Sequence, residues 1–187
     1  MRRIFVAVDI SDEARKKAGE YIVALRGDLP KFAASWVRPE KLHLTLRFIG
    51  DCGEAELKKV TEVVDSVSAR MHSFRLNITG TGVFPNEKRA RVLWLGVGGE
   101  TDLMVRAKDM FENEYHSIGL LGKREALTPH LTIARIKNIG WCREVVVAHL
   151  NSHFEPIEFE VSEIVVYESE LHPKGSSYSA VARYILG

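Results

Sequence analysis

Two short segments of this 187-residue chain share one pattern of side chains: a histidine, an apolar residue, a threonine and a second apolar residue. The first covers residues 43–46 (HLTL) and the second covers residues 130–133 (HLTI). Because alternate side chains of a β-strand point to the same face, the histidine and threonine of each segment would share one face. We therefore expect two strands that bury their apolar residues in a core and present an imidazole with a hydroxyl to a cleft.

The two motifs are 87 positions apart (130 − 43), and the same offset relates other parts of the chain. It brings the apolar run IFVAVDI near VLWLGVG and lays the first expected helix over the third. This repeat is one of element order more than of residue identity. We interpret residues 1–187 as a single domain with two pseudo-symmetric lobes, each carrying one motif.

Helices and strands alternate along the chain. Apolar residues at helical spacing predict helices within residues 11–27, 57–71, 103–119 and 143–150. Apolar runs bounded by turn residues predict strands at 2–10, 36–37, 42–50, 74–84, 90–97, 129–136, 157–167 and 178–185, the last two joined by the turn-rich HPKGSS. The pattern indicates a mixed α and β protein.

The charge of the chain gives no general attraction to nucleic acid. The formal net charge is only +1, so an anionic substrate would have to meet a local cluster of cations. Lys88, Arg89 and Arg91 form a basic run that could follow RNA, although a solvated turn is the commoner explanation. Only two cysteines and no apolar stretch of membrane-spanning length favour a cytoplasmic and monomeric protein.

Two histidines on opposite sides of a cleft, each beside a hydroxyl, suit displacement at phosphorus. The nucleophile enters on one side of the phosphorus and the leaving oxygen departs on the other. One imidazole would take a proton from the entering water and the other would give a proton to the leaving oxygen. The threonine hydroxyls would hydrogen-bond the non-bridging oxygens, where charge develops. This scheme requires neither a metal nor a cofactor.

Several segments resemble one known family. They are WVRPEKLHLTLRFIGD, GVFPNEKRARVLW, PHLTIARI and SELHPKGSSY, which together with the paired motifs extend from Arg3 to about Ile185. They resemble the 2H phosphoesterases, most closely the RNA 2′,3′-cyclic phosphodiesterases, long called 2′-5′ RNA ligases. The resemblance implies an α+β fold with two lobes, antiparallel sheets flanked by helices around a central cleft, and hydrolysis of a terminal 2′,3′-cyclic phosphate to a 2′-phosphate.

The resemblance also implies roles for single residues. His43 would be the proton donor to the leaving 3′ oxygen, His130 would be the proton acceptor that activates water, and Thr45 and Thr132 would hold the phosphate. The donor assignment comes from the resemblance alone, because the two motifs are too alike to decide it. The partner would be RNA with a 2′,3′-cyclic phosphate end, or a nucleotide, and 2′-5′ ligation would be a secondary, reverse activity.

Two more positions resemble substrate contacts of the family, namely Phe48 and Arg135, each five residues after a motif histidine. Phe48 would stack on a base and Arg135 would neutralise phosphate. Strict alternation places both side chains on the face opposite the histidines. A bulge in each strand would remove this conflict, and without one Arg47 is the better-placed cation.

Other readings of the same pattern remain open. The same chemistry could act on a 2′-5′ oligonucleotide or an ADP-ribose cyclic phosphate. The chain could also be a non-catalytic RNA- or nucleotide-binding module, or a metal-dependent hydrolase with histidine ligands. We expect the other five histidines at the surface or at helix ends, and Tyr178 either beside the cleft or buried. These histidines are His72, His116, His149, His153 and His172. Cys52 and Cys142 are isolated, which argues against a zinc site.

Overall fold

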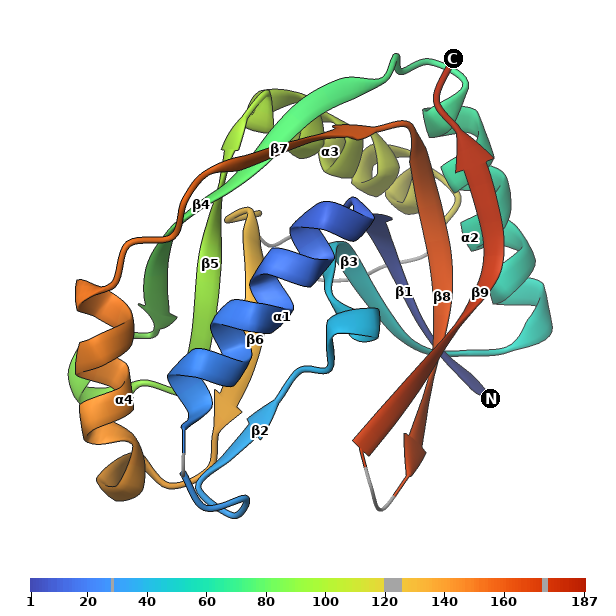
Figure 1. The fold of residues 1–187 in the computed structure, drawn as a ribbon. Helices are drawn as coiled ribbons and strands as arrows, with labels where there is room; N and C mark the ends of the chain where they lie inside the picture. Colours follow the sequence, from blue (N-terminus) through green and yellow to red (C-terminus); the bar gives the residue numbers. More distant parts are fainter. Residues whose placement is uncertain (28, 120–125, 173–174) are drawn as a thin grey trace.

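The computed structural model describes residues 1–27, 29–119, 126–172 and 175–187. Its strands form two antiparallel sheets, one with the order β3-β1-β8-β9 and one with the order β2-β6-β5-β4-β7 (Figure 1). The strands are β1 (Arg2–Asp9), β2 (Ala34–Trp36), β3 (His43–Cys52), β4 (Phe74–Phe84), β5 (Val92–Gly99), β6 (His130–Ile136), β7 (Ile157–Val161), β8 (Glu163–His172) and β9 (Gly175–Ile185). The expected α+β fold is confirmed.

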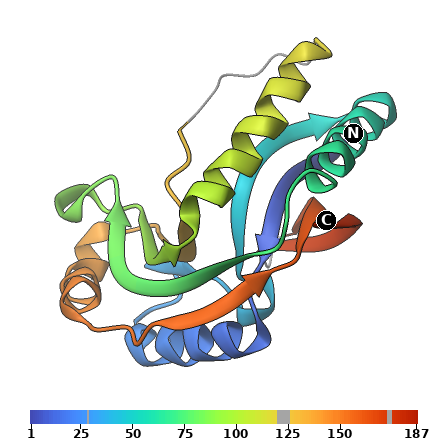
Figure 2. The same cartoon turned by 90° about the horizontal axis from the view of Figure 1, so that it is seen from above.

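Four helices of three to five turns flank these sheets in the described part of the chain. They are α1 (Asp12–Arg26), α2 (Glu54–Ser68), α3 (Thr101–Ser117) and α4 (Ile139–Asn151), and two short 3-10 helices are η1 (Pro39–Lys41) and η2 (Glu87–Arg89). α1 contacts α4 beside the five-stranded sheet, whereas α2 contacts β8 and β9 (Figure 2). None of the described helices is long and apolar enough to cross a membrane.

Local signals explain where the helices begin. Ser11 caps α1, because its side chain accepts a hydrogen bond from the backbone of Ala14. The fourth helix begins earlier than the sequence suggests, at Ile139, because Asn138 caps it by accepting from the backbone of Gly140. The second helix ends earlier than expected, at Ser68, although Met71 beyond it is still buried.

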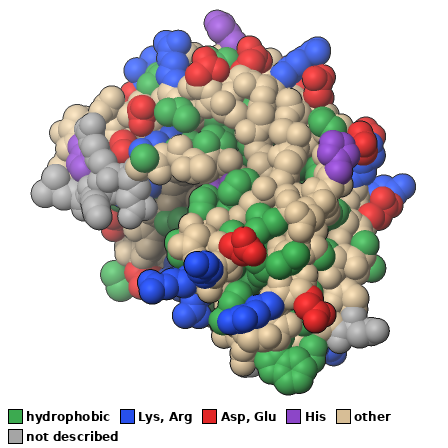
Figure 3. Space-filling view, turned by 90° about the vertical axis from the view of Figure 1, so that its left-hand side faces the viewer, with side chains coloured by type: hydrophobic (Ala, Val, Ile, Leu, Met, Phe, Trp, Pro, Cys, Tyr) green, Lys and Arg blue, Asp and Glu red, His purple; other side chains and the backbone are tan. Residues whose placement is uncertain are grey.

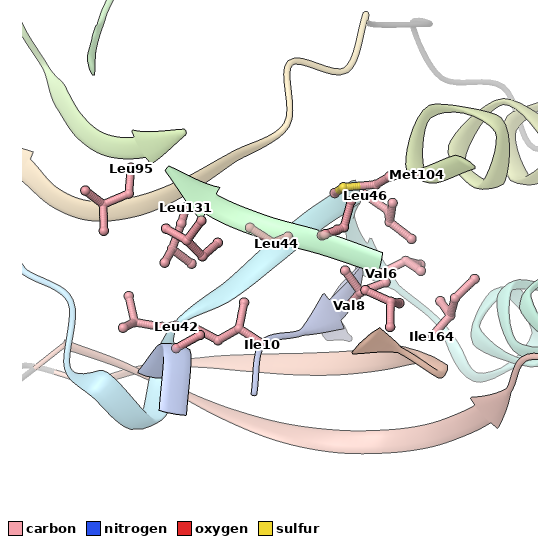
Figure 4. Packing of buried hydrophobic residues seen from close by; sticks show 14 of the residues in the cluster. Val6, Val8, Ile10, Leu42, Leu44, Leu46, Leu95, Met104, Leu131 and Ile164 are labelled. Atoms are coloured by element: carbon pink, nitrogen blue, oxygen red, sulfur yellow. The ribbon is translucent and has the colours of Figure 1, made fainter. Parts of the chain in front are cut away.

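The apolar residues of both motifs are buried, as their pattern predicts. Leu44, Leu131 and Ile133 are fully buried, and Leu46 is nearly so. Leu44 and Leu131 lie in one cluster with Leu42 and Leu95, in the region where the two sheets meet (Figure 4). Their burial fixes β3 and β6 side by side and holds the opposite faces of these strands toward a cleft.

The predicted strand over residues 157–167 is wrong as a single element. The chain breaks at Ser162, so that β7 pairs with β4 in one sheet while β8 pairs with β1 and β9 in the other. Two polar residues in succession, Ser162 and Glu163, shift the phase of the alternation. The backbone at the break is satisfied elsewhere, because the carbonyl of Ser162 accepts a hydrogen bond from Leu186. Of the predicted HPKGSS turn, residues 173–174 lie outside the described residues.

The two sheets have corresponding strand orders. An offset of 87 (130 − 43) lays β1 over β5, α1 over α3, β3 over β6 and α2 over α4. In the first sheet β1 lies between β3 and β8, and in the second β5 lies between β6 and β4. The pseudo-twofold relation of two lobes stays a prediction, which this correspondence supports.

Candidate active site

The imidazole of His43 is held by its own strand. Its Nδ1 lies 2.8 Å from the carbonyl oxygen of Lys41, and its Nε2 lies 3.1 Å from Oγ1 of Thr45. A carbonyl oxygen can only accept, so Nδ1 must carry the hydrogen and Nε2 is the nitrogen left for chemistry. The first motif therefore brings its histidine and threonine together on one face, as its alternation predicts.

The imidazole of His130 is held in the same way. Its Nδ1 lies 2.7 Å from the carbonyl oxygen of Thr128, which is two residues before it, as Lys41 is before His43. Nδ1 therefore donates in both motifs, and in both Nε2 is the ring nitrogen that this bond leaves unprotonated in the neutral imidazole. This shared hydrogen bond is a local property of the chain entering each strand, and it fixes the tautomer of each ring.

The surroundings of His43 are aromatic and enclosed. Its ring centroid lies 4.8 Å from that of Phe5, 5.3 Å from that of Tyr178 and 6.2 Å from that of Tyr167. Burial lowers the pKa of His43 below its ordinary value, while the Lys41 carbonyl and the Asp9 carboxylate act in the opposite direction.

The carboxylate of Asp9 lies across the strand pair from His43. Tyr167 donates its hydroxyl to both carboxylate oxygens, at 2.8 and 2.9 Å, and Arg183 lies 3.1 Å away. These bonds keep the negative charge in place. Asp9 therefore favours the protonated form of His43 without being the residue that transfers a proton.

His130 has different neighbours. The ring of Phe84 stands perpendicular to it at 5.0 Å, and the ring of Trp94 lies 6.4 Å away. Trp94 pairs with Thr132 across β5 and β6. Sequence reasoning did not single out Phe5, Phe84 or Trp94, since each approaches a histidine from a neighbouring strand rather than through the motif itself.

Each motif strand contains a bulge at the fourth motif residue. In β3 the pairing with β1 skips Leu46, and in β6 the pairing with β5 skips Ile133. A bulge sets two successive residues against one on the partner strand, so the alternation shifts by one residue beyond it. The conflict that strict alternation raises is thereby removed in both strands.

The bulges turn Phe48 and Arg135 to the histidine face. The ring of Phe48 lies 5.8 Å from that of Phe5, which itself contacts His43. Arg135 is exposed, follows two buried residues, and its charge reaches His43, where it lowers the pKa of the imidazole. Both residues therefore lie where the resemblance places substrate contacts.

The bulge in β3 turns the side chain of Arg47 toward α3. Its Nη1 forms an ion pair with Oε1 of Glu112 in α3, at 3.0 Å. Oε2 of Glu112 accepts a hydrogen bond from Lys108 at 3.0 Å, and both of these residues are buried. Arg47 belongs to this cluster between β3 and α3, although its side chain reaches the edge of the cleft.

Three hollows that share lining residues connect the two motifs. One, of about 300 Å³, is lined by residues that include Thr45, Phe48, Phe84 and His130. A second, of about 330 Å³, is lined by residues that include Phe48 and Arg135, together with Phe5 and Tyr178. A third, of about 160 Å³, contains His43 and shares Tyr178 with the second. These hollows thus bring His43, Thr45 and His130 together with Phe48 and Arg135, and Tyr178 lies beside them.

The other histidines lie away from this cleft. His72, His153 and His172 are exposed and His116 is half-buried near the end of α3. His149 is fully buried and lies in the last turn of α4, which is one of the helix-end positions expected for these histidines. Its Nδ1 accepts from the Tyr21 hydroxyl at 2.7 Å, because Nε2 lies 3.1 Å from two backbone carbonyl oxygens and donates to them.

The potential metal ligands form no cluster in the described part of the chain. Cys52 and Cys142 are buried free thiols. Across the described residues, no group of three or more His, Cys, Asp or Glu side chains is placed to hold a metal ion.

Comparisons with known proteins agree with this geometry. The family model described as "LigT like Phosphoesterase" matches residues 8–94, which include the first motif. The RNA 2′,3′-cyclic phosphodiesterase of Thermotoga maritima is 34% identical over 184 residues, covering 96% of this chain and 92% of the relative. That of Methanothermobacter thermautotrophicus is 35% identical over 185 residues, covering 95% of each.

Solved structures share the fold along nearly the whole chain. A Thermus thermophilus protein is 27% identical with a TM-score of 0.79, covering 98% of this chain and 97% of that one. Ligand-free Escherichia coli LigT is 21% identical with a TM-score of 0.75, covering 99% and 97%. Since relatives more than 30% identical extend over almost all of the sequence, the chain belongs to the LigT-like 2H phosphoesterases, in the family of the RNA 2′,3′-cyclic phosphodiesterases.

Proposed function

We propose that this protein hydrolyses the 2′,3′-cyclic phosphate at the end of an RNA to a 2′-phosphate, with two histidines as acid and base. The observation that carries the proposal is that His43, Thr45 and His130, from different sheets, line adjoining hollows that share Phe48 and Tyr178. Each imidazole is anchored through Nδ1 to a backbone carbonyl, so each offers Nε2. The relatives that carry this activity in their names support the substrate.

The reaction needs one proton removed and one supplied. Nε2 of His130 takes a proton from water as the water oxygen forms a bond to phosphorus. The bond from phosphorus to O3′ breaks, and Nε2–H of His43 gives its proton to O3′. The products are a 2′-phosphate and a 3′-hydroxyl, and a proton exchange with solvent returns both histidines to their starting forms. A ribose 5′-hydroxyl in place of water would form a 2′-5′ phosphodiester by the same displacement, with O3′ again leaving and taking the proton.

The surroundings of His43 act on its protonation in both directions, and burial, the largest influence, lowers the pKa of the imidazole. The nearby Asp9 carboxylate stabilises the imidazolium, which opposes the effect of burial. A substrate phosphate carries a further negative charge into the cleft and would raise the pKa of His43 on binding. Thr45 and Thr132 would donate hydrogen bonds to the non-bridging oxygens, and Arg135 would compensate charge.

Phe48 completes the proposed site. Its ring is largely exposed, at 63% of its surface, in the hollow that it shares with Thr45 and His130. An exposed aromatic face beside a phosphate site suits the terminal base, which would stack on it. E. coli LigT, which shares the fold, has been solved with 3′-AMP and with ATP, and this supports nucleotide binding in general. We also expect the protein to act as a cytoplasmic monomer.

The test is hydrolysis of a short RNA with a 2′,3′-cyclic phosphate end, with chelator present, from pH 5 to pH 9. We expect a 2′-phosphate product and a bell-shaped rate profile. A 3′-phosphate product would contradict the roles given to the leaving oxygen and His43. Absence of turnover, with tight binding of the same RNA, would instead favour a binding module. A panel with a 2′-5′ oligonucleotide and an ADP-ribose cyclic phosphate would identify another substrate.

A further inference from the structure

A group of exposed cations lies beyond the Arg135 end of the cleft. It consists of Lys88 and Arg89 in η2, Arg91 just after it, and Arg143 in α4, which we call the basic strip. Figure 3 shows the side of the molecule that includes α4, where Lys and Arg side chains lie interspersed with Asp and Glu side chains. The net charge of the whole chain is only +1, so this grouping is local.

Backbone pairing connects the basic strip to the candidate site, because Arg91 is adjacent in sequence to the residue that pairs with Arg135. Arg135 pairs across the sheet with Val92, the residue that follows Arg91. The carbonyl of Arg91 accepts a hydrogen bond from Ile136 at 2.9 Å, and its amide donates to Phe84 at 2.7 Å. Arg91 is thus fixed between Arg135 and the strand end that carries Phe84, the neighbour of His130.

The outer part of the strip borders a hollow of its own. Lys88 and Arg143 both line a hollow of about 490 Å³ between η2 and α4. Glu87 lines it too and is the acidic residue there, while Ile139 and Val146 form part of its apolar wall. Two cations against one carboxylate leave the hollow with a positive balance.

The cations of the strip are not neutralised by the protein. Among the described residues, none of the four has a carboxylate within ion-pair distance, whereas Arg2, Arg70 and Arg183 each do. Keeping several like charges together at a surface destabilises a fold slightly and favours an anionic partner.

The strip extends outward from the histidine site. His130 and Arg135 are five positions apart on β6, about 16 Å along the backbone at the usual rise of a strand, while the ring centroid of Phe84 lies only 5.0 Å from that of His130. η2 and α4 lie beyond the Arg135 end of the sheet. A chain of several phosphates fits cations that are spread along this path.

We propose that the basic strip binds the phosphodiester backbone of the RNA on the 5′ side of its terminal nucleotide. The inference rests on the proposed function, and it defines the substrate as an oligonucleotide rather than a mononucleotide. The strand enters over η2 and α4, passes Arg91 and Arg135, and ends between the histidines. The contacts are to phosphates, so they increase affinity without sequence preference.

The test compares two substrates and two triple variants. The substrates are 2′,3′-cyclic AMP and a ten-nucleotide RNA with the same cyclic end. The strip variant is Lys88→Ala with Arg89→Ala and Arg143→Ala. The control variant, Lys16→Ala with Lys59→Ala and Arg106→Ala, removes the same charge from exposed positions on α1, α2 and α3. Circular dichroism and thermal unfolding check that all three proteins fold.

We expect the strip variant to raise the KM for the ten-nucleotide RNA by about tenfold or more. The plot of its logarithmic affinity against logarithmic salt concentration should become less steep by about 2, since each single-strand phosphate contact contributes roughly 0.7. Hydrolysis of 2′,3′-cyclic AMP should stay unchanged, and the control variant should match the wild type with both substrates.

Three results would overturn the inference. The first is an unchanged KM for the RNA in the strip variant, and the second is an equal loss in the control variant. The third is equal competition by polyglutamate, which would indicate an acidic protein as partner. Failure of the proposed function is separate: the wild type would then hydrolyse neither substrate, and fluorescence anisotropy with a 2′-phosphorylated RNA would still test the strip.

Discussion

The two motif strands are alike in backbone and unlike in surroundings. Both hold the histidine through Nδ1 to the carbonyl two residues earlier, and both contain a bulge at the fourth motif residue. His43 is walled by three aromatic rings and faces Asp9, whereas His130 is flanked by Phe84 and Trp94 in a more open hollow. The motif therefore determines which ring nitrogen carries the hydrogen, and the neighbouring strands determine the surroundings in which the imidazole is protonated.

This difference bears on the assignment of acid and base. The sequence of the motifs treats the two histidines as equivalent. The structure distinguishes them, because only His43 has a carboxylate opposite it on the paired strand. This charge stabilises the imidazolium of His43, whereas burial has the larger effect and lowers its pKa. Changes to single residues can test how far the two strands differ.

The largest effect should come from the histidines themselves. His43→Ala and His130→Ala should each lower kcat by about 10²- to 10⁴-fold, since each removes a proton-transfer group. The double variant should be little worse than either single variant, because the two groups act in one step. Single-turnover rates on the cyclic RNA measure this, with thermal unfolding as the control for folding. Full activity in either single variant would rule out the two-histidine mechanism.

Loss of the threonine hydroxyls should have the next largest effect. Thr45→Val and Thr132→Val should each reduce kcat by about tenfold to a hundredfold, as expected for one hydrogen bond to a charged group. Thr45 also contacts Nε2 of His43, so only its replacement should also alter the pH profile. Steady-state kinetics across the pH range distinguishes the two variants. Identical profiles would show that the contact with His43 has no role.

Replacement of Arg135 should weaken substrate binding, whereas replacement of Arg47 should lower the stability of the fold. Arg135→Ala should raise KM by about tenfold and leave the unfolding free energy nearly unchanged, because the side chain is exposed. Arg47→Ala should lower the unfolding free energy by about 1–3 kcal/mol, because it leaves Oε1 of buried Glu112 without this cation. Urea unfolding together with steady-state kinetics checks both. A reversed pattern would make Arg47 the substrate cation.

The smallest effect should be a displacement of the pH profile. His43 must be protonated to act as the acid, and burial lowers its pKa in the free enzyme. The rate measured as kcat/KM should therefore fall as pH rises through this lowered pKa. In the complex the substrate phosphate raises the pKa, so the falling limb of kcat should lie at higher pH. Coincident limbs would show that the substrate does not change the protonation of His43.

Much of the site follows from the sequence, because the motifs determine local geometry. Alternation is enough to predict that His43 faces the same way as Thr45 while Leu44 is buried. The bulges are different, since an extra apolar residue such as Leu46 has no signature of its own in the sequence. Without them Phe48 and Arg135 are placed on the wrong face, and only the pairing with β1 and β5 corrects this.

The fold was less predictable where the chain changes sheets. The apolar pattern on either side of Ser162 favours a strand, and the register of that strand depends on partners far away in sequence. The aromatic rings around His43 also depend on strands that are distant in sequence, since Phe5 lies in β1 and Tyr167 lies in β8. Long-range pairing of this kind leaves no local signal in the sequence.

The change of sheet at Ser162 has a consequence for how the protein is made. β1 leaves the ribosome long before its second neighbour in the sheet, β8. A nascent chain that has emerged only as far as residue 162 already holds both motifs but lacks Tyr167 and Tyr178. The surroundings of His130 can form at that stage, whereas the pocket of His43 closes only after β8 and β9 have been made.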